Sequence, residues 1–478
     1  MSTGRAILHR PARLALAAAI LGCVALWAGA DDRPVLAPFD LAAAIAGAES
    51  GAEVLVPPGV YPGPIQIDRP MRLIARPGAI LDAQGRGDVV RITAPDVTLR
   101  GFIIRATGDS VDRENAGVAV SAPRATIEDN RLEDVLFGIV IAGAPGSVVR
   151  GNSITGKDLD LGRRGDAIRL WQSAGTTVES NTVRHCRDVV VWYSSGAVLR
   201  HNSVTGSRYG LHAMYTDRCT FEDNRLEGNS VGIFMMYSQD LEARRNLIVG
   251  NRGPSGFGVG LKDVDGALLE DNLIAGNRVG INLDTSPVRA DLHHTHRGNI
   301  IGFNDVGIAF MPSVRNNHFH DNAFVENIES VAIMGGGAFE GQNSFTVDGR
   351  GNYWSDYRGF DLDGDGVGDL PHRDEGLFEN LMDREAKLRF FLYSPAQQAI
   401  DMAARSFPVV QPRPRLVDDR PLTRPVVSPA LASIMPRPVR AGGGFGLAAG
   451  GLLALGALVA SGAMVGLRLG ARIGKESP

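Results

Sequence analysis

Sulfur and imidazole side chains recur at a regular spacing in the middle of this 478-residue chain. Two pairs of methionines have nearly the same internal spacing, and a histidine stands two positions before the first pair: His212, Met214, Met236, Met311 and Met334. Thioether sulfur and imidazole nitrogen favour Cu(I) over hard cations. These side chains are therefore candidates for a transient Cu(I) site. The alternative is a strip of adaptable methionines covered by another part of the chain or by a protein partner.

A second group of candidate ligands consists of histidines further along the chain. His318 and His320 are separated by one residue, so both side chains lie on the same side of a strand and could bridge one metal ion. We add them to the copper candidates. We interpret the run from His293 to His296 as a turn insertion two faces of the repeat away. The competing interpretation of these histidines is a polar loop with nothing bound.

Four aspartates near the C-terminal third have the spacing of a calcium loop. They occupy positions 1, 3, 5 and 9, with a glycine at position 6: Asp361, Asp363, Asp365 and Asp369. The twelfth position is His372 where a bidentate glutamate is expected, so the ligand set is incomplete or uses Glu375. The segment is either a structural Ca²⁺ site or a hydrogen-bonded turn.

A sequence repeat predicts the elements that position these residues. Between about 54 and 352, an asparagine returns after each short strand-like triplet, at Asn130, Asn152, Asn181, Asn202, Asn224, Asn246, Asn272, Asn299, Asn322 and Asn343. A base period of about 22 residues is typical of a solenoid of stacked coils. Stacked asparagines can hydrogen-bond along the column and tolerate left-handed backbone angles. A second asparagine follows five positions later in several coils, at Asn229, Asn251, Asn277, Asn304 and Asn327.

Aligning the coils predicts which side chains point outward. One position is apolar in every coil, at Leu170, Val191, Ala213, Met235, Leu261, Leu283, Phe310 and Ile333. Because strand side chains alternate between faces, this column is the core and both neighbouring columns are exterior. The column after it holds Trp171, Trp192, Met214, Met236, Lys262, Asp284, Met311 and Met334. We therefore predict an all-β fold, a right-handed parallel β-helix over residues 31–352, with the methionines outside.

The two ends of the chain indicate export and attachment to a membrane. Residues 1–30 have the pattern of a signal peptide, so the mature chain should begin near Asp31. Residues 445–467 lack charge and are long enough as a helix to cross a bilayer, which predicts a transmembrane helix and cytoplasmic tail within 441–478. The protein should be periplasmic and tethered to the inner membrane.

Between these ends we expect three further segments. Residues 41–46 look like a short helix that caps the first coil, because an open solenoid end exposes unpaired strand edges. Residues 353–407 should form a C-terminal cap and docking segment. Residues 408–440 contain eight prolines, which predicts an extended linker.

The net charge and the number of cysteines bear on the expected partners and on disulfide bonding. A net charge of -4 gives no sequence-independent attraction to a polyanion, so we expect no nucleic-acid partner. After removal of the signal peptide only Cys186 and Cys219 remain. They are too few for a disulfide framework, and we expect both to be buried small residues.

Four segments resemble the NosD family. They are Gly-Leu-His-Ala-Met-Tyr at 210–215 with Gly-Ile-Phe-Met-Met-Tyr one coil later, Gly-Asn-Tyr-Trp-Ser-Asp-Tyr at 351–357, and Ser-Pro-Ala-Gln-Gln-Ala-Ile-Asp at 394–401. The resemblance extends over about residues 31–425. It implies a periplasmic β-helix protein that is needed to assemble the copper sites of nitrous oxide reductase.

The resemblance also implies partners and site residues. It implies an ABC transporter with a membrane subunit and a cytoplasmic ATPase, a chaperone that supplies copper, and the reductase that receives it. The chain lacks a phosphate-binding Gly-Lys-Ser/Thr loop, in agreement with ATP being used by another subunit. His212, Met214 and Met236 are then the best candidates for the copper site. The segment from about 377 to 407 would dock on the membrane subunit through Phe390, Phe391 and Tyr393. The expected transmembrane helix departs from the family pattern.

Two other classes of function compete with this interpretation. Many right-handed β-helices are carbohydrate-active enzymes such as polysaccharide lyases and epimerases, which need a base, a neutralising cation and an acid in one groove. Lys262, Asp263 and Asp284 are neighbours in the alignment and could form such a cluster, although an exterior ion pair explains them as well. The chain lacks the Asp-Pro-His-Asp/Glu signature of an alginate epimerase. The other alternative is a scaffold that docks the reductase without binding metal. We expect a protein that is not an enzyme.

Overall fold

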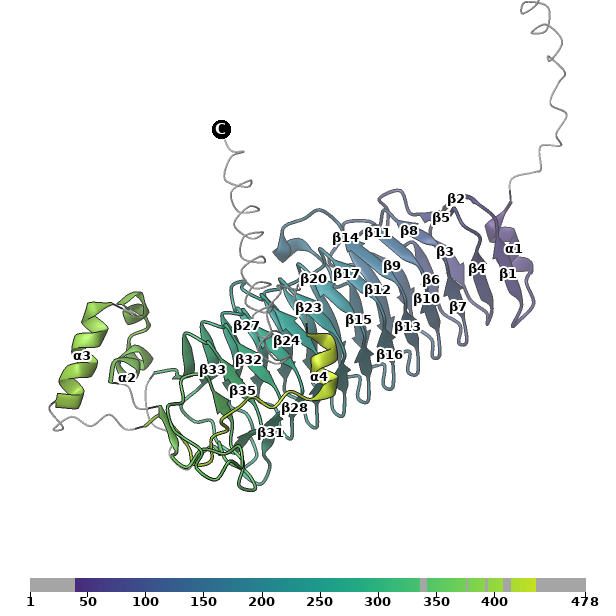
Figure 1. The fold of residues 1–478 in the computed structure, drawn as a ribbon. Coiled ribbons are helices and arrows are strands. Elements are labelled where there is room, and N and C mark those ends of the chain that lie inside the picture. Colours follow the sequence, from purple (N-terminus) through teal and green to yellow (C-terminus); the bar gives the residue numbers. More distant parts are fainter. Residues whose placement is uncertain (1–38, 336–341, 375–376, 392–393, 407–413, 436–478) are drawn as a thin grey trace, which may run out of the picture. The chain divides into compact units, whose positions relative to one another are not determined.

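The computed structural model describes residues 39–335, 342–374, 377–391, 394–406 and 414–435. The chain winds into successive coils of three short strands, and equivalent strands of adjacent coils pair in parallel to form three sheets (Figure 1). The predicted all-β fold, a parallel β-helix of the right-handed type, is confirmed. We name the sheets A, B and C in the order in which the chain visits them.

The strands are mostly short. Sheet A contains β1 (Glu53–Val56), β4 (Arg72–Ala75), β7 (Thr98–Arg100), β10 (Thr126–Glu128), β13 (Val148–Arg150), β16 (Thr177–Glu179), β19 (Val198–Arg200), β22 (Thr220–Glu222), β25 (Glu242–Arg244), β28 (Leu268–Glu270), β31 (His294–Arg297) and β34 (Asn317–His320). Sheet B contains β2 (Gly59–Pro62), β5 (Ala79–Asp82), β8 (Ile103–Arg105), β11 (Arg131–Val135), β14 (Ser153–Gly156), β17 (Thr182–Arg184), β20 (Ser203–Thr205), β23 (Arg225–Glu227), β26 (Leu247–Val249), β29 (Leu273–Ala275), β32 (Ile300–Gly302), β35 (Ala323–Val325) and β37 (Tyr353–Trp354). Sheet C contains β3 (Ile65–Ile67), β6 (Val90–Ile92), β9 (Ala116–Val120), β12 (Phe137–Ala142), β15 (Ile168–Trp171), β18 (Asp188–Trp192), β21 (Tyr209–Met214), β24 (Val231–Met236), β27 (Phe257–Lys262), β30 (Val279–Asp284), β33 (Val306–Phe310) and β36 (Glu329–Ile333).

The register predicted for sheet C is the observed one. Met214 pairs with Trp192 on one side and with Met236 on the other. The predicted core column is buried throughout, with exposed fractions of 0–1%, from Leu170 to Ile333. The length of the repeat therefore determines which side chains enter the core.

A continuous asparagine ladder stabilises one corner of the coils. The side-chain amide of Asn246 donates to Asn272 Oδ1 at 2.9 Å and to the carbonyl of Phe221, and its own Oδ1 accepts from Asn224. The same pattern links Asn130 through to Asn322. The second series of asparagines, from Asn229 to Asn327, also forms a hydrogen-bonded ladder.

Two details of the ladder differ from the sequence prediction. Asn322 bonds to Asn352, whereas Asn343 accepts from Asn317 at a different corner. The left-handed backbone angles belong to the residues just before the ladder asparagines, such as Asp223 and Arg245, rather than to the asparagines themselves. The asparagines are therefore selected for their side-chain hydrogen bonds.

Both ends of the β-helix are closed by other elements. At the first coil, α1 (Leu41–Gly47) buries Leu41 and Ile45 against the core, as predicted. At the last coil, the indole of Trp354 in β37 stacks on Phe324 with a centroid distance of 4.1 Å. Its Nε1 donates to the buried carboxylate of Asp418 at 2.9 Å. Figure 1 shows α1 beside β1 and the α2 (Leu377–Arg384) and α3 (Pro395–Ser406) helices beyond the last coils.

The predicted extended linker is wrong for the part that the structure describes. Residues 414–435 return to the β-helix, where β39 (Leu416–Asp418) pairs antiparallel with β38 (His372–Asp374). The helix α4 (Pro429–Ile434) then packs on the outside of sheet B, with Leu431 fully buried among side chains that include Leu273 and Ile300. Apolar residues within the proline-rich stretch make these contacts.

A buried arginine fastens this returning segment to the last coil. Arg415 is 1% exposed and lies between Glu329 of β36 at 2.6 Å, Asp374 of β38 at 2.8 Å and Asp383 of α2 at 3.5 Å. Three carboxylates thus share one guanidinium, and one oxygen of Asp383 has no hydrogen-bond partner among the described residues.

This excess of buried negative charge predicts a pH dependence. Burial raises the pKa of Asp383 to about 6, although Arg415 opposes the shift. Because an unfolded aspartate titrates near 3.8, the folded protein binds this proton more tightly, so the stabilisation is present below that pH and is lost as the pH rises through about 6. We expect hydrogen exchange of α2, corrected for intrinsic rates, to show more protection near pH 5 than near pH 7.5. An Asp383→Asn variant should lose this difference; a variant that keeps it would assign the effect to another group.

Several sequence predictions lie outside the described residues. These are the signal peptide at 1–30, the transmembrane helix and tail at 441–478, and Tyr393. Among the residues that are described, no helix is long and apolar enough to span a membrane.

Candidate copper site

The outer face of sheet C carries a strip of tryptophan and methionine side chains. Trp171, Trp192, Met214 and Met236 occupy one register position in four successive coils, and each is partly exposed. Their strand neighbours Ala213 and Met235 are fully buried in the core. The strip therefore faces outward, as the alternation of the sequence predicted.

Three tyrosines border this strip. Tyr193, Tyr215 and Tyr237 stack on one another with ring centroids 5.3 and 5.0 Å apart, and each is 36–46% exposed. Each follows the strip residue of its coil and has a left-handed backbone angle. The stacked tyrosines make a continuous edge beside the two thioethers.

His212 lies on the same face as Met214 but is covered by aromatic rings. It is 4% exposed, and the rings of Trp192, Tyr209 and Phe234 surround it with centroid distances of 6.1, 4.9 and 6.2 Å. Neither imidazole nitrogen has a hydrogen-bond partner among the described residues. Since buried polar atoms are nearly always paired, His212 has unused capacity to bind a ligand.

A buried carboxylate lies next to this imidazole. Asp188 Oδ2 is 3.7 Å from His212 Nδ1, and the same carboxylate is ion-paired with Arg208. Burial raises the pKa of Asp188, but its interactions with His212 and Arg208 outweigh burial and lower the pKa overall. Burial and the nearby Asp188 raise the pKa of Asp166 to about 6. The arrangement places an anion behind the imidazole, as carboxylates do behind many metal-binding histidines.

The structure divides the predicted methionine set into two pairs. Lys262 and Asp284 occupy the two coils that follow Met236 and form an ion pair at 3.7 Å. Met311 and Met334 lie beyond them, with exposed fractions of 37% and 44%. The two pairs therefore share a wall but are separated by two coils. Of the two pairs, only Met214 and Met236 lie on the strand of His212 and on the strand that pairs with it.

The predicted histidine ligands belong to another sheet. His318 and His320 project from the outside of β34 in sheet A. The interpretation of residues 293–296 as a turn insertion is wrong, because His294 and His296 lie in β31 and are fully buried. The run is also in the adjacent coil of the same sheet as His318, rather than two faces away. Burial lowers the pKa of His296 to about 4.

The aspartate loop is compact. Asp361, Asp363 and Asp365 bring one carboxylate oxygen each within 4.8 Å of the others. Asp361 accepts backbone hydrogen bonds from Gly364 and Gly366, and Asp369 accepts one from Leu362. The twelfth residue, His372, is buried against Trp354 at 4.8 Å and does not join the group.

The predicted docking phenylalanines are exposed and the predicted buried cysteines are buried. Phe390 and Phe391, at the end of η2 (Ala386–Phe391), are 90% and 52% exposed.

Cys186 and Cys219 are free thiols, and burial raises the pKa of Cys186 to about 12. The thiols are therefore poor candidates for the copper site.

Sequence reasoning missed three side chains that shape the site: Asp188, Arg208 and Tyr209. Asp188 begins β18, in the coil before that of His212. Tyr209 begins β21, the strand of His212, and Arg208 directly precedes it. The only available signal was the repeat itself, which pairs Asp188 with Tyr209.

Comparisons with known proteins agree with the resemblance noted in the sequence. Residues 150–359 match the family described as periplasmic copper-binding protein (NosD). Two curated proteins named probable ABC transporter binding protein NosD are similar to the chain. The one from Stutzerimonas stutzeri is 29% identical over 387 residues, which cover 77% of this chain and 86% of the relative. The one from Pseudomonas aeruginosa is 29% identical over 380 residues, which cover 77% and 87%.

Two solved structures that are similar to the chain in fold are a mannuronan epimerase module and an alginate lyase. The A-module of the mannuronan C-5 epimerase AlgE6 of Azotobacter vinelandii has 17% sequence identity and a TM-score of 0.42, covering 61% of this chain and 90% of that one. A PL6 alginate lyase bound to a trisaccharide has 13% identity and a TM-score of 0.41, covering 64% and 85%. In sequence, the chain is similar to the family described as periplasmic copper-binding protein (NosD) and to the two NosD proteins.

Proposed function

We propose that this protein is a periplasmic accessory factor that holds Cu(I) transiently on the outer face of sheet C during assembly of the copper sites of nitrous oxide reductase. The observation that carries the proposal is the position of His212, a buried imidazole with no hydrogen-bond partner among the described residues, beside two outward thioethers from adjacent coils. The copper-binding description of the matched family and the binding-protein names of the relatives support it.

The donor set suits copper in transit. Adjacent strands are about 4.8 Å apart, so the long side chains of Met214 and Met236 can reach one ion. Thioether and imidazole ligands are neutral, and the soft thioether sulfurs favour Cu(I). Since neither is a thiolate, the site should release copper to a stronger acceptor.

The aromatic rings around His212 suggest the order of binding. Met214 and Met236 are partly exposed, whereas the imidazole lies beneath Tyr209 and Phe234. Copper would first contact the two sulfurs, and a rotation of the Phe234 or Tyr209 ring would then open the imidazole. Met311 and Met334 would be a separate, weaker contact further along the wall.

We propose as partners an ABC transporter, with its membrane subunit and cytoplasmic ATPase, a copper chaperone and the reductase. The exposed Phe390 and Phe391, together with Tyr393, would dock on the membrane subunit. The segment 441–478 would tether the protein to the inner membrane. The direct transfer of copper to the reductase is part of the same proposal.

Two of the alternatives have less support. Lys262 and Asp284 form a surface ion pair, which is the ordinary explanation of such neighbours and does not require an enzyme active site. A scaffold without metal gives no role to His212 Nε2, which is buried and has no hydrogen-bond partner among the described residues. The aspartate loop would be structural, either with Ca²⁺ or as the hydrogen-bonded turn that its backbone contacts support.

Anaerobic titration of the full chain with Cu(I) against a colorimetric Cu(I) chelator tests the proposal. Replacing Met214 and Met236 by leucine and His212 by alanine should remove one bound Cu(I), because all three proposed donors are lost. The matched control is Met311→Leu with Met334→Leu, which changes the same residue type on the same wall and should keep that ion. Unchanged binding by the triple variant refutes the assignment, and release of unsaturated sugars after incubation with uronate polymers would support a lyase instead.

A further inference from the structure

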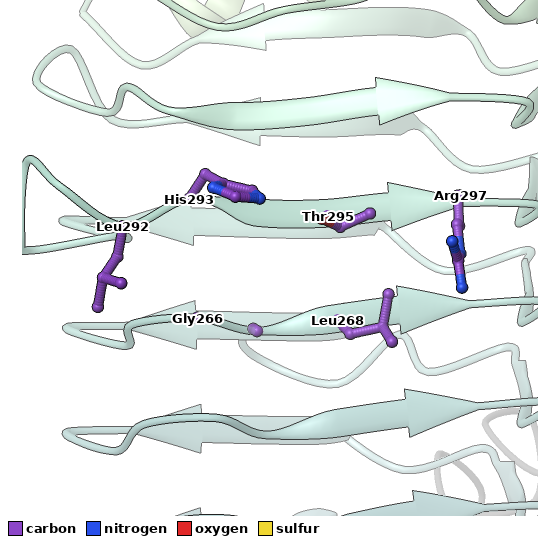
Figure 2. A pocket seen from close by; sticks show the side chains of 7 residues that line it. Gly266, Leu268, Leu292, His293, Thr295 and Arg297 are labelled. Atoms are coloured by element: carbon purple, nitrogen blue, oxygen red, sulfur yellow. The ribbon is translucent and has the colours of Figure 1, made fainter. Parts of the chain in front are cut away.

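Two histidines near the end of sheet A point into the core of the β-helix. His294 and His296 of β31 are fully buried. Their neighbours along the chain, His293, Thr295 and Arg297, border a depression of about 370 Å³ on the outside of the sheet (Figure 2). The strand β31 therefore carries two ionisable side chains on its inner face.

The position of His296 is apolar in every other strand of sheet A. The register places His296 between Leu269 of β28 and Phe319 of β34. The same column holds Val54, Leu73, Leu99, Ile127, Val149, Val178, Leu199, Phe221 and Ala243 in the preceding strands. Apolar side chains thus satisfy the packing of this column, and packing does not explain the imidazole.

The hydrogen bonds of the two rings suit neutral imidazoles. His294 Nδ1 accepts from the backbone N–H of Ala267 at 2.8 Å, so the proton of this ring is on Nε2. His296 Nε2 lies 3.1 Å from Asn317 Oδ1. Since the amide nitrogen of Asn317 donates elsewhere, its Oδ1 accepts this bond from His296. The remaining nitrogens, His294 Nε2 and His296 Nδ1, are buried without a partner among the described residues.

A second proton on either ring would have no acceptor. On His294 it would occupy the nitrogen that accepts from Ala267, and on His296 it would stand on the unpartnered Nδ1. The titratable groups that act on the rings are themselves histidines, namely His293 and His296 on His294, and His318 on His296. Protonation would therefore bury a positive charge without a counter-charge, which is strongly unfavourable.

The inward side chains around the two rings are uncharged. Those beside them in sheet A are Ala267, Leu269, Asn317 and Phe319, and those of sheets C and B in the same coil are Ile281, Leu283 and Ile301. A charged imidazole could gain hydration only by leaving the core.

The place of β31 in the fold allows such a movement. The coil that contains β31 spans 27 residues between Asn272 and Asn299, whereas coils such as that from Asn224 to Asn246 span 22. Extra residues in this coil form the turn before β31, next to the depression in Figure 2. The last strand of sheet A, β34, pairs with the rest of the sheet through β31. Outward movement of β31 would therefore open sheet A before its last strand.

We propose that His294 and His296 form an acid-sensitive switch, in which protonation of either ring releases β31 from the stack and opens sheet A in front of β34. The released imidazoles hold their protons in water. The switch belongs to a different sheet from the sulfur strip and does not depend on the proposed copper function.

Amide hydrogen exchange of the full chain, corrected for intrinsic rates, tests the switch. Burial lowers the pKa of His296 to about 4, so the closed form binds the proton less tightly than the open form, in which an imidazole titrates near 6.5. The stabilisation by the neutral ring is complete above about pH 6.5 and is lost as the pH falls through about 4. From His296 alone, β31 should be roughly 30-fold less protected at pH 5 than at pH 7.5. The central strand β22 should change little.

Two variants and a control separate the switch from other effects of acid. Replacing His294 and His296 together by glutamine removes both ionisable rings and should abolish the difference between the two pH values. His296→Phe should reduce it, and phenylalanine suits this column because Phe221 and Phe319 already occupy it. The matched control is His201→Gln, which removes an exposed imidazole and should keep the full difference.

Three results would overturn the proposal. The first is equal protection of β31 at both pH values in the unaltered chain. The second is a loss at pH 5 that survives the double glutamine substitution. The third is a loss in β22 as large as that in β31, because it would show general unfolding in acid rather than the release of one strand.

Discussion

Replacing Arg415 by alanine is expected to destabilise the closure of the last coil by about 3–5 kcal/mol, because removing one partner of a buried ion pair leaves uncompensated charge. Here three carboxylates, Glu329, Asp374 and Asp383, would lose their shared cation. Hydrogen exchange should then show loss of protection in β38, β39 and α2. The strands of the central coils should keep theirs, since each coil contacts mainly its neighbours.

The same returning segment supplies a matched control. Arg420 is an arginine of the same segment whose ion pair with Asp365, at 3.6 Å, is about half exposed. An exposed pair contributes about 0–1 kcal/mol, so Arg420→Ala should change exchange little. Equal effects of the two substitutions would show that Arg415 does not fasten the segment.

Replacing Asn246 by alanine is expected to destabilise the central coils by roughly 2–6 kcal/mol, because two buried backbone groups lose a partner and each such loss costs about 1–3 kcal/mol. The two groups are the N–H of Asn224 and the carbonyl of Phe221, which both bond to the Asn246 side chain. Urea unfolding followed by circular dichroism measures the change.

Asn282 is the control for this prediction. It is an asparagine on the outside of β30, partly exposed, and is not part of the ladder. Asn282→Ala should fall within about 0.5 kcal/mol of the unaltered chain. If both variants unfold at the same urea concentration, the ladder is not a major source of stability.

The register of sheet C from Trp171 to Met236 could be predicted from the sequence because the coils there differ in length by at most one residue. Counting one repeat length from Met214 reaches Met236, and the strict alternation of strand side chains then fixes which of them face outward. The same counting failed where insertions change the length of a coil. His294 and His296 follow an insertion, and their polar character suggested a loop although both enter the core.

The closure of the β-helix could not be predicted for a different reason. Arg415 stands among prolines, and nothing local indicates that carboxylates from 32 to 86 positions earlier surround it. The environment of His212 has the same origin: Asp188 and Phe234 approach it only when the coils stack. Residue type predicted the candidate ligands, whereas burial and pairing required the three-dimensional structure.

The outer faces of sheets C and A carry different kinds of potential metal ligand. Sheet C offers thioethers with one covered imidazole at Met214, Met236 and His212, whereas sheet A offers imidazoles alone. The free thiols of Cys186 and Cys219 are buried, and burial raises the pKa of each, so neither is expected to compete for copper.

X-ray absorption at the copper edge of the Cu(I)-loaded full chain tests the copper assignment most directly. We expect two sulfur neighbours and one nitrogen neighbour per copper, with the sulfur contribution lost in a variant carrying Met214→Leu and Met236→Leu. A spectrum with only nitrogen and oxygen neighbours, or a sulfur contribution that survives in that variant and disappears when Cys186 and Cys219 are replaced by alanine, would contradict it.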